Sequence, residues 1–148
     1  MHIATKGSKI DISLEKQLEE FSNNLSAEIR RGNILFLYGE MGVGKTTFVK
    51  YLINNLQIKF DQKKTEITSP TFNIMNEYTV NDLIIKHYDL YRIKSLNELE
   101  NLNLFEKNDE AILLIEWPQI IEKKPKIITK LYFEYENDYQ NRYIKILN

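Results

Sequence analysis

The sequence contains no cysteine among its 148 residues. This absence excludes a disulfide framework, a thiolate metal site and a cysteine nucleophile, and it fits a reducing compartment. Long hydrophobic runs are also missing: the longest span about five residues, whereas a membrane-spanning helix needs roughly 18. The opening residues, "MHIATKGSKIDIS", have neither the apolar core of a signal peptide nor the Arg-rich character of a transit peptide. We therefore expect a cytoplasmic protein with no membrane partner.

An excess of charge of one sign is lacking as well. Lys and Arg together number 20 and Asp and Glu 21, which leaves a net charge of -1. Without a strong overall field the chain has no evident surface for tracking nucleic-acid phosphates, so any role with nucleic acid should be local or indirect. The length suffices for one sizeable core but not for two ordinary domains. Residues 1–148 are therefore expected to form a single domain.

The first part of the chain alternates between helical and strand patterns. Apolar residues recur at helical spacing within residues 11–32 and predict an amphipathic helix with Ser13 as its N-cap. The apolar run at residues 33–38 predicts a buried strand. Residues 46–58 again carry apolar side chains on one helical face, and the charged stretch 59–66 predicts an exposed connection.

The second part predicts further strands and a short helix. Residues 71–93 indicate two strands around a turn, and residues 111–118 place five apolar residues before an acid, a tryptophan and a proline. Residues 126–148 suggest two more strands. Between these segments, Ser95 and Glu98 form the capping-box pattern of a short helix. The elements together indicate an α/β fold whose central sheet mixes parallel and antiparallel strands and is flanked by helices.

One stretch carries a specific chemical pattern. Residues 37–48, "LYGEMGVGKTTF", match the P-loop pattern G-x-x-x-x-G-K-[ST] between a predicted strand and a predicted helix, which is the context that the pattern requires. The glycines let backbone N–H groups turn toward phosphates, while Lys45 can reach the β- and γ-phosphates and the Thr46 hydroxyl can bind Mg²⁺. The predicted nucleoside triphosphate site comprises Gly39, Glu40, Met41, Gly42, Val43, Gly44, Lys45, Thr46 and, more weakly indicated, Thr47.

Two acids follow predicted strands and are candidates for holding the metal or orienting the attacking water. Glu116 ends the apolar run 112–115, where a buried strand would carry it to the carboxyl edge of the sheet beside the P-loop. The alternative is an ordinary exposed acid at a strand end. Asp89, in "HYDLYR", ends the second hairpin strand, and its spacing is equally compatible with the capping of a turn.

Other residues near these acids leave alternatives open. A loop threonine can sense the γ-phosphate in P-loop switches, so Thr71 in "TSPTF", residues 68–72, could order its loop when a triphosphate binds. Ser and Thr beside Pro are, however, commonly turn formers. His87 is one of two histidines, and a lone histidine in a strand favours a structural role. Tyr91 and Trp117 are expected to be packing residues unless a partner covers them.

Four stretches together resemble the TsaE family, also called YjeE, whose members are small P-loop ATPases. They are "GEMGVGKTTF", "SPTF" followed by "NEY", "HYDLYR" and "IEWP", in the family's order and with similar spacing. The leading helix and a trailing "RYIKI" extend the resemblance over nearly the whole chain. Glu40 and Val43 stand where the family usually has Asp and Ala, but both are variable positions of the P-loop pattern, so phosphate binding is still expected.

The resemblance implies an activity and partners. The family helps bacteria to make threonylcarbamoyladenosine in tRNAs that read codons beginning with A. Its ATPase is weak alone and is stimulated by TsaB and TsaD, and TsaD transfers the threonylcarbamoyl group to adenosine. The implied cofactors are ATP and Mg²⁺. Contact with tRNA would be indirect, through the complex.

The resemblance also implies roles for individual residues. Lys45 would bind phosphate, Thr46 and Glu116 would bind Mg²⁺, and Asp89 would be an essential acid of the site. The other implied residues are the switch-like loop Ser69, Pro70, Thr71 and Phe72, the site neighbour Trp117 and the nucleotide neighbour Arg142.

The main alternative function is that of a P-loop kinase acting on a small metabolite. Such enzymes usually need several arginines to clamp the migrating phosphoryl group and a lid to exclude water. The sequence has four arginines and no Arg-rich segment after Glu116. A GTP-dependent switch is a weaker alternative, because the sequence has no Asn-Lys-x-Asp stretch of the kind that reads guanine. An ATPase is therefore the preferred interpretation.

Overall fold

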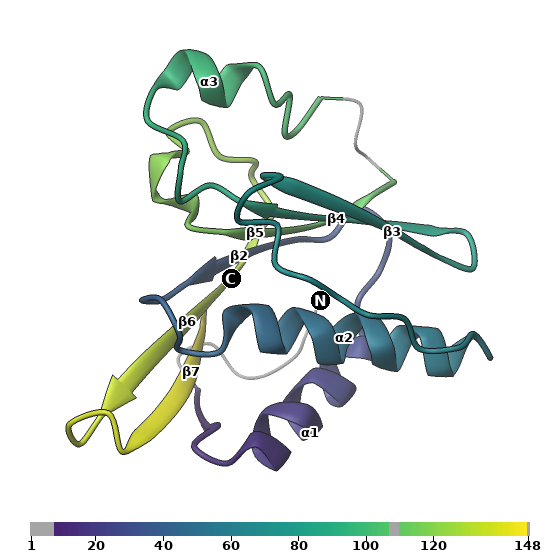
Figure 1. Cartoon of the computed structure of the whole chain (residues 1–148), viewed down its shortest axis with the longest axis vertical. Helices are drawn as coiled ribbons and strands as arrows, with labels where there is room; N and C mark the ends of the chain where they lie inside the picture. The colour runs from purple at the N-terminus through teal and green to yellow at the C-terminus, as the bar shows by residue number, and fades with distance from the viewer. Residues whose placement is uncertain (1–7, 107–109, 148) are drawn as a thin grey trace.

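The computed structural model describes residues 8–106 and 110–147. The single-domain prediction for residues 1–148 and the interpretation of the opening residues both extend to residues 1–7, which lie outside this description. Figure 1 shows the elements of the described part. In chain order they are β1 (Lys9–Asp11), α1 (Glu15–Ser26), β2 (Ile34–Tyr38), α2 (Lys45–Lys59), β3 (Met75–Val80), β4 (Leu83–Asp89), α3 (Leu96–Glu100), β5 (Ile112–Glu116), the 3₁₀ helix η1 (Pro118–Ile120), β6 (Thr129–Glu136) and β7 (Asn141–Leu147).

The strands of the described residues form one sheet in the order β1-β7-β6-β2-β5-β4-β3. The four central strands β6, β2, β5 and β4 run parallel, and the pairs at both edges are antiparallel. Short turns join β3 to β4 and β6 to β7, so these pairs must be antiparallel, whereas the parallel strands are joined by longer crossovers. The predicted α/β fold with a mixed sheet and flanking helices is thereby confirmed.

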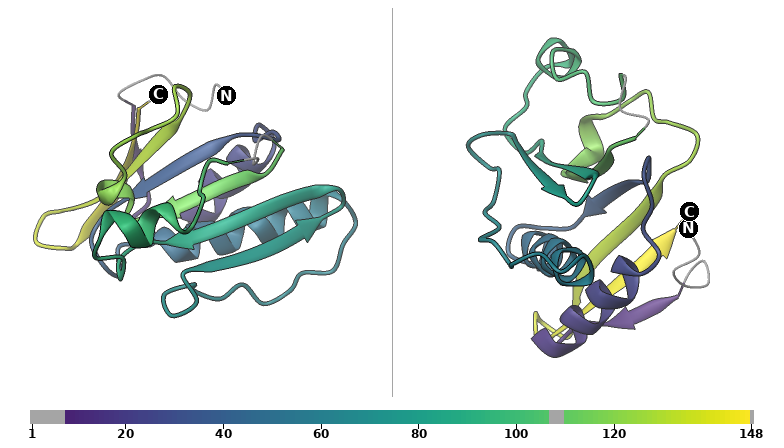
Figure 2. Two further views of the ribbon diagram at one scale, coloured as in Figure 1. Left: turned by 90° about the horizontal axis from the view of Figure 1, so that it is seen from above. Right: turned by 90° about the vertical axis from the view of Figure 1, so that its right-hand side faces the viewer.

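The sheet carries its helices on both faces. Figures 1 and 2 show α1 and α2 against one face, and α3 on the other. Successive residues of β2 point to opposite faces of the sheet. Leu35 and Leu37 pack in the core with α1 and α2, while Phe36 belongs to the core of the opposite face. Burial on both faces explains the continuous apolar runs of β2 and β5.

The start of the chain differs from the sequence prediction. The first helix begins at Glu15, and its N-cap is Leu14 rather than the predicted Ser13. The Ser13 hydroxyl instead accepts the Arg142 N–H at 3.0 Å and lies 2.6 Å from a carboxylate oxygen of Asp11. The residues before it form β1, which pairs with β7. Three residues carry too little pattern to predict a strand whose partner lies more than 100 residues later.

The end of the first helix also differs from the prediction. The first helix ends at Ser26, before the predicted end, and the last residues of the pattern form a turn in which the Arg30 N–H donates to Oδ1 of Asn33 at 2.7 Å. The predicted short helix and its Ser95 cap are confirmed, since α3 follows Ser95 and the Ser95 hydroxyl accepts the Glu98 N–H at 3.2 Å. In the part of the chain with described structure, no helix is both long and apolar enough to cross a membrane.

Candidate functional site

The P-loop and both candidate acids meet at one edge of the sheet. The parallel strands β2, β5 and β4 all end there. Glu116 at the end of β5 is in register with Leu37 of β2 on one side and with Asp89 of β4 on the other. The carboxyl edge of a parallel sheet is the usual place for a nucleotide in α/β folds. Sequence positions that are far apart thus converge because the strands run in the same direction.

Two glycines of the P-loop, Gly39 and Gly42, are required for different structural reasons. Gly39 has φ 148°, and a Cβ at this position would lie 2.7 Å from the carbonyl oxygen of Phe133, so a side chain cannot fit without movement. Gly42 has φ 84°, but a Cβ there would meet no heavy atom within 4 Å. Only glycine adopts such backbone angles at little cost. The loop therefore packs on β6 at Gly39 and leaves open space at Gly42, where a ligand can approach the backbone.

Lys45 is buried in this site with 4% of its surface exposed. Its ammonium group donates to the carbonyl of Gly39 and lies 3.8 Å from the ring centroid of Trp117. Burial lowers the pKa of Lys45, and the nearby carboxylates of Glu116 and Asp89 partly offset this effect. A cation in this position can neutralise the charge of a bound phosphate.

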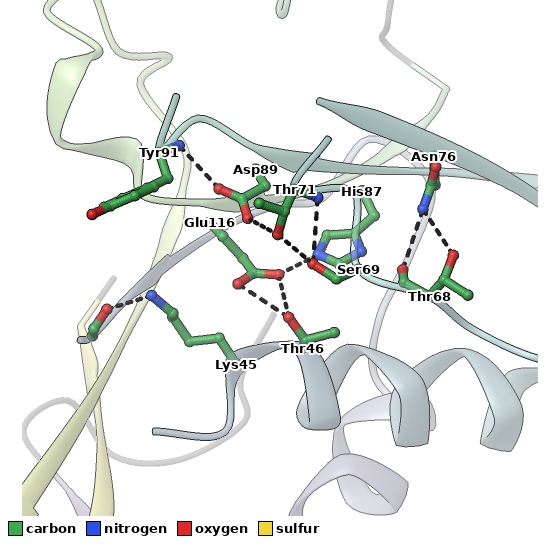
Figure 3. A network of polar contacts seen from close by, with 11 residues as sticks. Lys45, Thr46, Thr68, Ser69, Thr71, Asn76, His87, Asp89, Tyr91 and Glu116 are labelled. Atoms are coloured by element: carbon green, nitrogen blue, oxygen red, sulfur yellow. Dashed lines mark hydrogen bonds and ion pairs between the residues drawn. The ribbon is translucent and has the colours of Figure 1, made fainter. Parts of the chain in front are cut away.

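Glu116 joins the P-loop helix to the sheet. The Thr46 hydroxyl donates to Oε2 of Glu116 at 3.0 Å, and the same oxygen lies 2.6 Å from Nε2 of His87. Figure 3 shows these contacts converging on one carboxylate. Glu116 is 3% exposed, so it is not the ordinary surface acid that its position after a strand left open.

Asp89 connects the predicted switch loop to the sheet. One of its carboxylate oxygens accepts the Thr71 hydroxyl at 3.1 Å, and the other accepts the backbone N–H of Tyr91 at 2.9 Å. The hydroxyls of Thr71 and Ser69 lie 2.6 Å apart, so the loop reaches the acid through two linked hydroxyls (Figure 3). Asp89 thus caps its own turn through Tyr91 and also faces the site, which combines the two alternatives that the sequence left open.

One pocket collects most of the predicted site residues. Its lining includes Met41, Gly42, Gly44, Lys45, Thr46, Thr47, Ser69, Thr71, Asp89, Glu116, Trp117 and Arg142. The predicted residues outside this lining are Gly39, Glu40, Val43, Pro70 and Phe72.

The residues outside the lining have identifiable surroundings. Val43 is fully buried in the core beneath the loop, and Glu40 is exposed. Pro70 is buried, and its carbonyl accepts the Ile74 N–H. Phe72 is 83% exposed, with its ring 5.3 Å from the Arg92 guanidinium. These side chains therefore shape or flank the site without lining it.

Arg142 reaches the site from the last strand. One of its guanidinium nitrogens donates to the carbonyl of Val43 at 3.3 Å. From the neighbouring strand, the hydroxyl of Tyr135 donates to the carbonyl of Gly42 at 3.1 Å. The β6–β7 hairpin thus holds two carbonyls of the P-loop and fixes the loop against the last two strands.

Two residues near the acids were given only packing or structural roles by the sequence. Tyr91 lines the pocket, 46% exposed, with its ring 4.9 Å from that of Trp117. His87 is fully buried and contacts Glu116. The signal that could have found His87 is its spacing: residues two apart on a strand share a face, so His87 and Asp89 lie on the same side of β4. That signal also needs the neighbouring strand, which the sequence does not identify.

The donor set matches the requirements of a magnesium nucleotide. Among the described residues no group of three or more His, Asp or Glu side chains is placed to hold a metal by itself. Mg²⁺ is usually bound through one or two protein oxygens together with substrate phosphates and water. The hydroxyl of Thr46 and the carboxylate of Glu116 offer such oxygens beside the P-loop.

Comparison with known proteins places this site in context. A family model described as "Threonylcarbamoyl adenosine biosynthesis protein TsaE" matches residues 12–144. The chain is 36% identical over 111 residues to the tRNA threonylcarbamoyladenosine biosynthesis protein TsaE of Rickettsia typhi, covering 75% of this chain and 74% of that protein. It is 39% identical over 113 residues to the protein of the same name from Borreliella burgdorferi, covering 75% of this chain and 78% of that protein.

A solved structure is similar over most of the chain. The crystal structure of Bacillus subtilis YdiB superposes with a TM-score of 0.70 at 26% sequence identity. The match covers 95% of this chain and 84% of that one. The similarity therefore extends over most of the fold rather than over the P-loop motif alone.

Proposed function

The chain belongs to the TsaE family of threonylcarbamoyl adenosine biosynthesis proteins, and on this premise we propose that it is a magnesium-dependent ATPase acting in the formation of threonylcarbamoyladenosine in tRNA. We propose further that it acts with TsaB and TsaD, and that the partner subunits rather than this chain hold the tRNA. The modified tRNAs would be those that read codons beginning with A. Its cytoplasmic location stays a prediction.

One observation carries the ATPase proposal. The P-loop residues Lys45 and Thr46 share a pocket with two buried acids, Glu116 and Asp89. A P-loop alone binds phosphate, but hydrolysis also requires acids that can hold the metal or place a water. Here both acids stand at the ends of adjacent strands, in register with each other. This arrangement supports hydrolysis rather than simple binding.

Each residue has a role in the proposed reaction. Lys45 would contact the β- and γ-phosphate oxygens and stabilise their developing charge. Thr46 and Glu116 would hold Mg²⁺, because hydroxyl and carboxylate oxygens are the ligands it prefers. When bound there, Mg²⁺ would supply positive charge that neutralises the phosphates. Asp89 would help to place the attacking water, and its bond to Thr71 would couple this function to the loop 68–72.

The metabolite kinase is less well supported by the structure. Of the chain's four arginines, Arg142 is the one that lines the described pocket, and its guanidinium already donates to a P-loop carbonyl. A kinase that transfers a phosphoryl group to a metabolite usually needs several such cations. The pocket residues therefore favour water as the acceptor.

Phosphate release from ATP by the purified chain tests the proposal. It should be measured with and without Mg²⁺, and alone and with TsaB and TsaD from the same organism. We expect weak release alone, strong stimulation by the two partners, and loss of both with Lys45→Ala. Transfer of phosphate to a small metabolite, without stimulation, would instead favour the kinase. Absence of stimulation together with Mg²⁺-dependent hydrolysis would retain the ATPase but overturn the proposed partners.

A further inference from the structure

We propose that His87 is a positioning residue of the hydrolytic site, fixing the carboxylate of Glu116 so that one of its oxygens remains available to the pocket. The inference rests on the proposed ATPase function and adds to it a residue that the P-loop motif and the two acids do not include. It starts from the contact between Nε2 of His87 and Oε2 of Glu116, which lie 2.6 Å apart with both side chains buried.

The two oxygens of Glu116 differ in their surroundings. Oε2 takes both short contacts, with His87 at 2.6 Å and with the Thr46 hydroxyl at 3.0 Å. Oε1 has the longer contact with Thr46, at 3.4 Å. A carboxylate oxygen has two lone pairs, and the contacts to His87 and Thr46 occupy both at Oε2. The oxygen left with bonding capacity is therefore Oε1, and Glu116 lines the pocket.

The contact also fixes the role of the imidazole. A deprotonated carboxylate only accepts hydrogen bonds, so Nε2 of His87 must carry the proton. Among the described residues, Nδ1 of His87 has no hydrogen-bond partner. Within this described part of the chain, the imidazole therefore makes its side-chain hydrogen bond to Glu116 alone. The buried N–H of His87 and the Glu116 carboxylate thus satisfy each other's hydrogen-bonding capacity.

The position of His87 in the sheet makes it a rigid support. It lies within β4, and its register partner is Leu114 of the fully buried strand β5. A Glu side chain has three rotatable bonds and loses much freedom when held in one rotamer. A donor on the neighbouring strand can hold the Glu116 carboxylate before nucleotide arrives. Partners of this kind, which orient a metal ligand, typically change activity by about 10- to 100-fold when removed.

Three substitutions separate positioning from core filling. His87→Leu keeps an apolar group of similar bulk but removes the donor. In His87→Gln the amide nitrogen can take the place of Nε2, whereas in His87→Asn it corresponds to Nδ1 and falls short of Glu116. We expect kcat for ATP to fall about 10- to 100-fold in the Leu variant, with KM changed less than roughly threefold. The Gln variant should recover most of the loss and the Asn variant should not.

Thermal unfolding of each variant accompanies the kinetics. Should the Leu variant fail to fold, the comparison of the Gln and Asn variants still tests the positioning role. Both carry a polar amide, and they differ in whether its nitrogen can reach Glu116. Equal kcat in the Gln and Asn variants would overturn the positioning role, and so would a Leu variant with wild-type kcat.

A second measurement reads the contact without requiring any activity. The sequence has two histidines, His2 and His87, so a long-range proton–nitrogen spectrum of the free protein is assigned by comparison with His87→Gln. We expect a proton on Nε2 of His87 that exchanges slowly with water, and faster exchange in Glu116→Ala. A His87 signal with its proton on Nδ1 would overturn the inference.

The two experiments also separate this inference from the proposed function. A wild-type protein that binds but does not hydrolyse ATP, alone or with TsaB and TsaD, would overturn the ATPase proposal and with it the catalytic consequence of the contact. The Nε2 proton would still decide whether His87 holds Glu116. Hydrolysis by the wild type that is unchanged in all three variants would overturn only the role of His87.

Discussion

The hydroxyl of Thr46 lies 3.0 Å from Oε2 of Glu116, although the two residues are 70 positions apart in the sequence. This bond joins the first turn of α2 to the end of β5. It also means that, in the free protein, the two proposed metal ligands are bonded to each other. A hydroxyl oxygen that donates its hydrogen keeps its lone pairs, and Oε1 of Glu116 has only the longer contact with Thr46, at 3.4 Å. Both side chains could therefore offer an oxygen to Mg²⁺ while this hydrogen bond persists.

Substitution of Glu116 by Gln should separate ATP binding from hydrolysis. The amide keeps the shape of the side chain and can still accept one hydrogen bond, but it lacks the negative charge that attracts Mg²⁺. We expect phosphate release to fall by about 100-fold or more, while ATP binding is retained. The measurement is a Mg²⁺ titration of phosphate release and of ATP affinity. Glu122→Gln, an exposed acid after η1, is the control and should behave as the wild type.

Lys45→Ala should abolish turnover without unfolding the protein. The ammonium group contacts one carbonyl and one aromatic ring, and its burial is unfavourable for the charge. Its removal therefore costs the fold little while the phosphates lose their cation. Phosphate release and circular dichroism are the two readouts, and Lys50→Ala, an exposed lysine of the same helix, is the matched control. Wild-type hydrolysis by the Lys45 variant would refute the assignment.

Nucleotide binding should take up a proton at alkaline pH. Burial lowers the pKa of Lys45 below its ordinary value of 10.5, and bound phosphates favour the charged form and raise it again. Between these two pKa values binding takes up a proton, so ATP affinity falls as the pH rises through the pKa of Lys45 in the free protein. Below that pKa, Lys45 contributes no pH dependence. Calorimetry in buffers of different ionisation enthalpy measures the uptake.

The Lys45→Arg variant provides the control for this uptake. Arginine stays protonated throughout this pH range, so proton uptake due to this position should disappear. An unchanged uptake in the Arg variant would assign the proton to another group.

Thr71→Val should loosen the loop 68–72 and slow hydrolysis. The substitution removes the hydroxyl that donates to Asp89 and lies 2.6 Å from that of Ser69, while it preserves the shape of the side chain. Loss of one such hydrogen bond costs about 1.4 kcal/mol, which corresponds to a roughly tenfold slower turnover if the bond persists in the transition state. Hydrogen exchange of the loop should increase. Thr71→Ser should restore both, and Thr79→Val, exposed on β3, should change neither.

Two P-loop glycines should respond differently to alanine. At Gly39 a Cβ would lie 2.7 Å from a backbone oxygen, and φ is 148°, so we expect Gly39→Ala to lower the free energy of unfolding by about 2–4 kcal/mol. At Gly42 the space is open, so only backbone strain of about 1 kcal/mol is expected. Gly42→Ala should weaken ATP binding more than it weakens the fold. Denaturant unfolding and ATP titration of both variants test this difference, and equal losses of stability would contradict it.

Local patterns were sufficient to predict most of the fold. The P-loop, the strand before it, the helix after it, the two hairpins and the capped helix α3 each depend on residues close together in the sequence, through hydrophobic periodicity, turn formers and caps. The short strand β1 was not predictable, because it forms only through its hydrogen bonds to β7, which lies at the other end of the sequence. The prediction of Ser13 as an N-cap was wrong for the same reason, since its hydroxyl accepts the N–H of Arg142, a residue near the other end of the sequence.

The candidate site divides in the same way. The sequence by itself determined that Lys45 and Thr46 follow a glycine-rich loop and that Glu116 and Asp89 end strands, since these are properties of spacing. Only the tertiary structure decided that the two acids are buried in register with each other and that His87 and Tyr91 belong to the site. Strand order and direction set these contacts, and both follow from packing of the whole sheet against its helices rather than from any short stretch of residues.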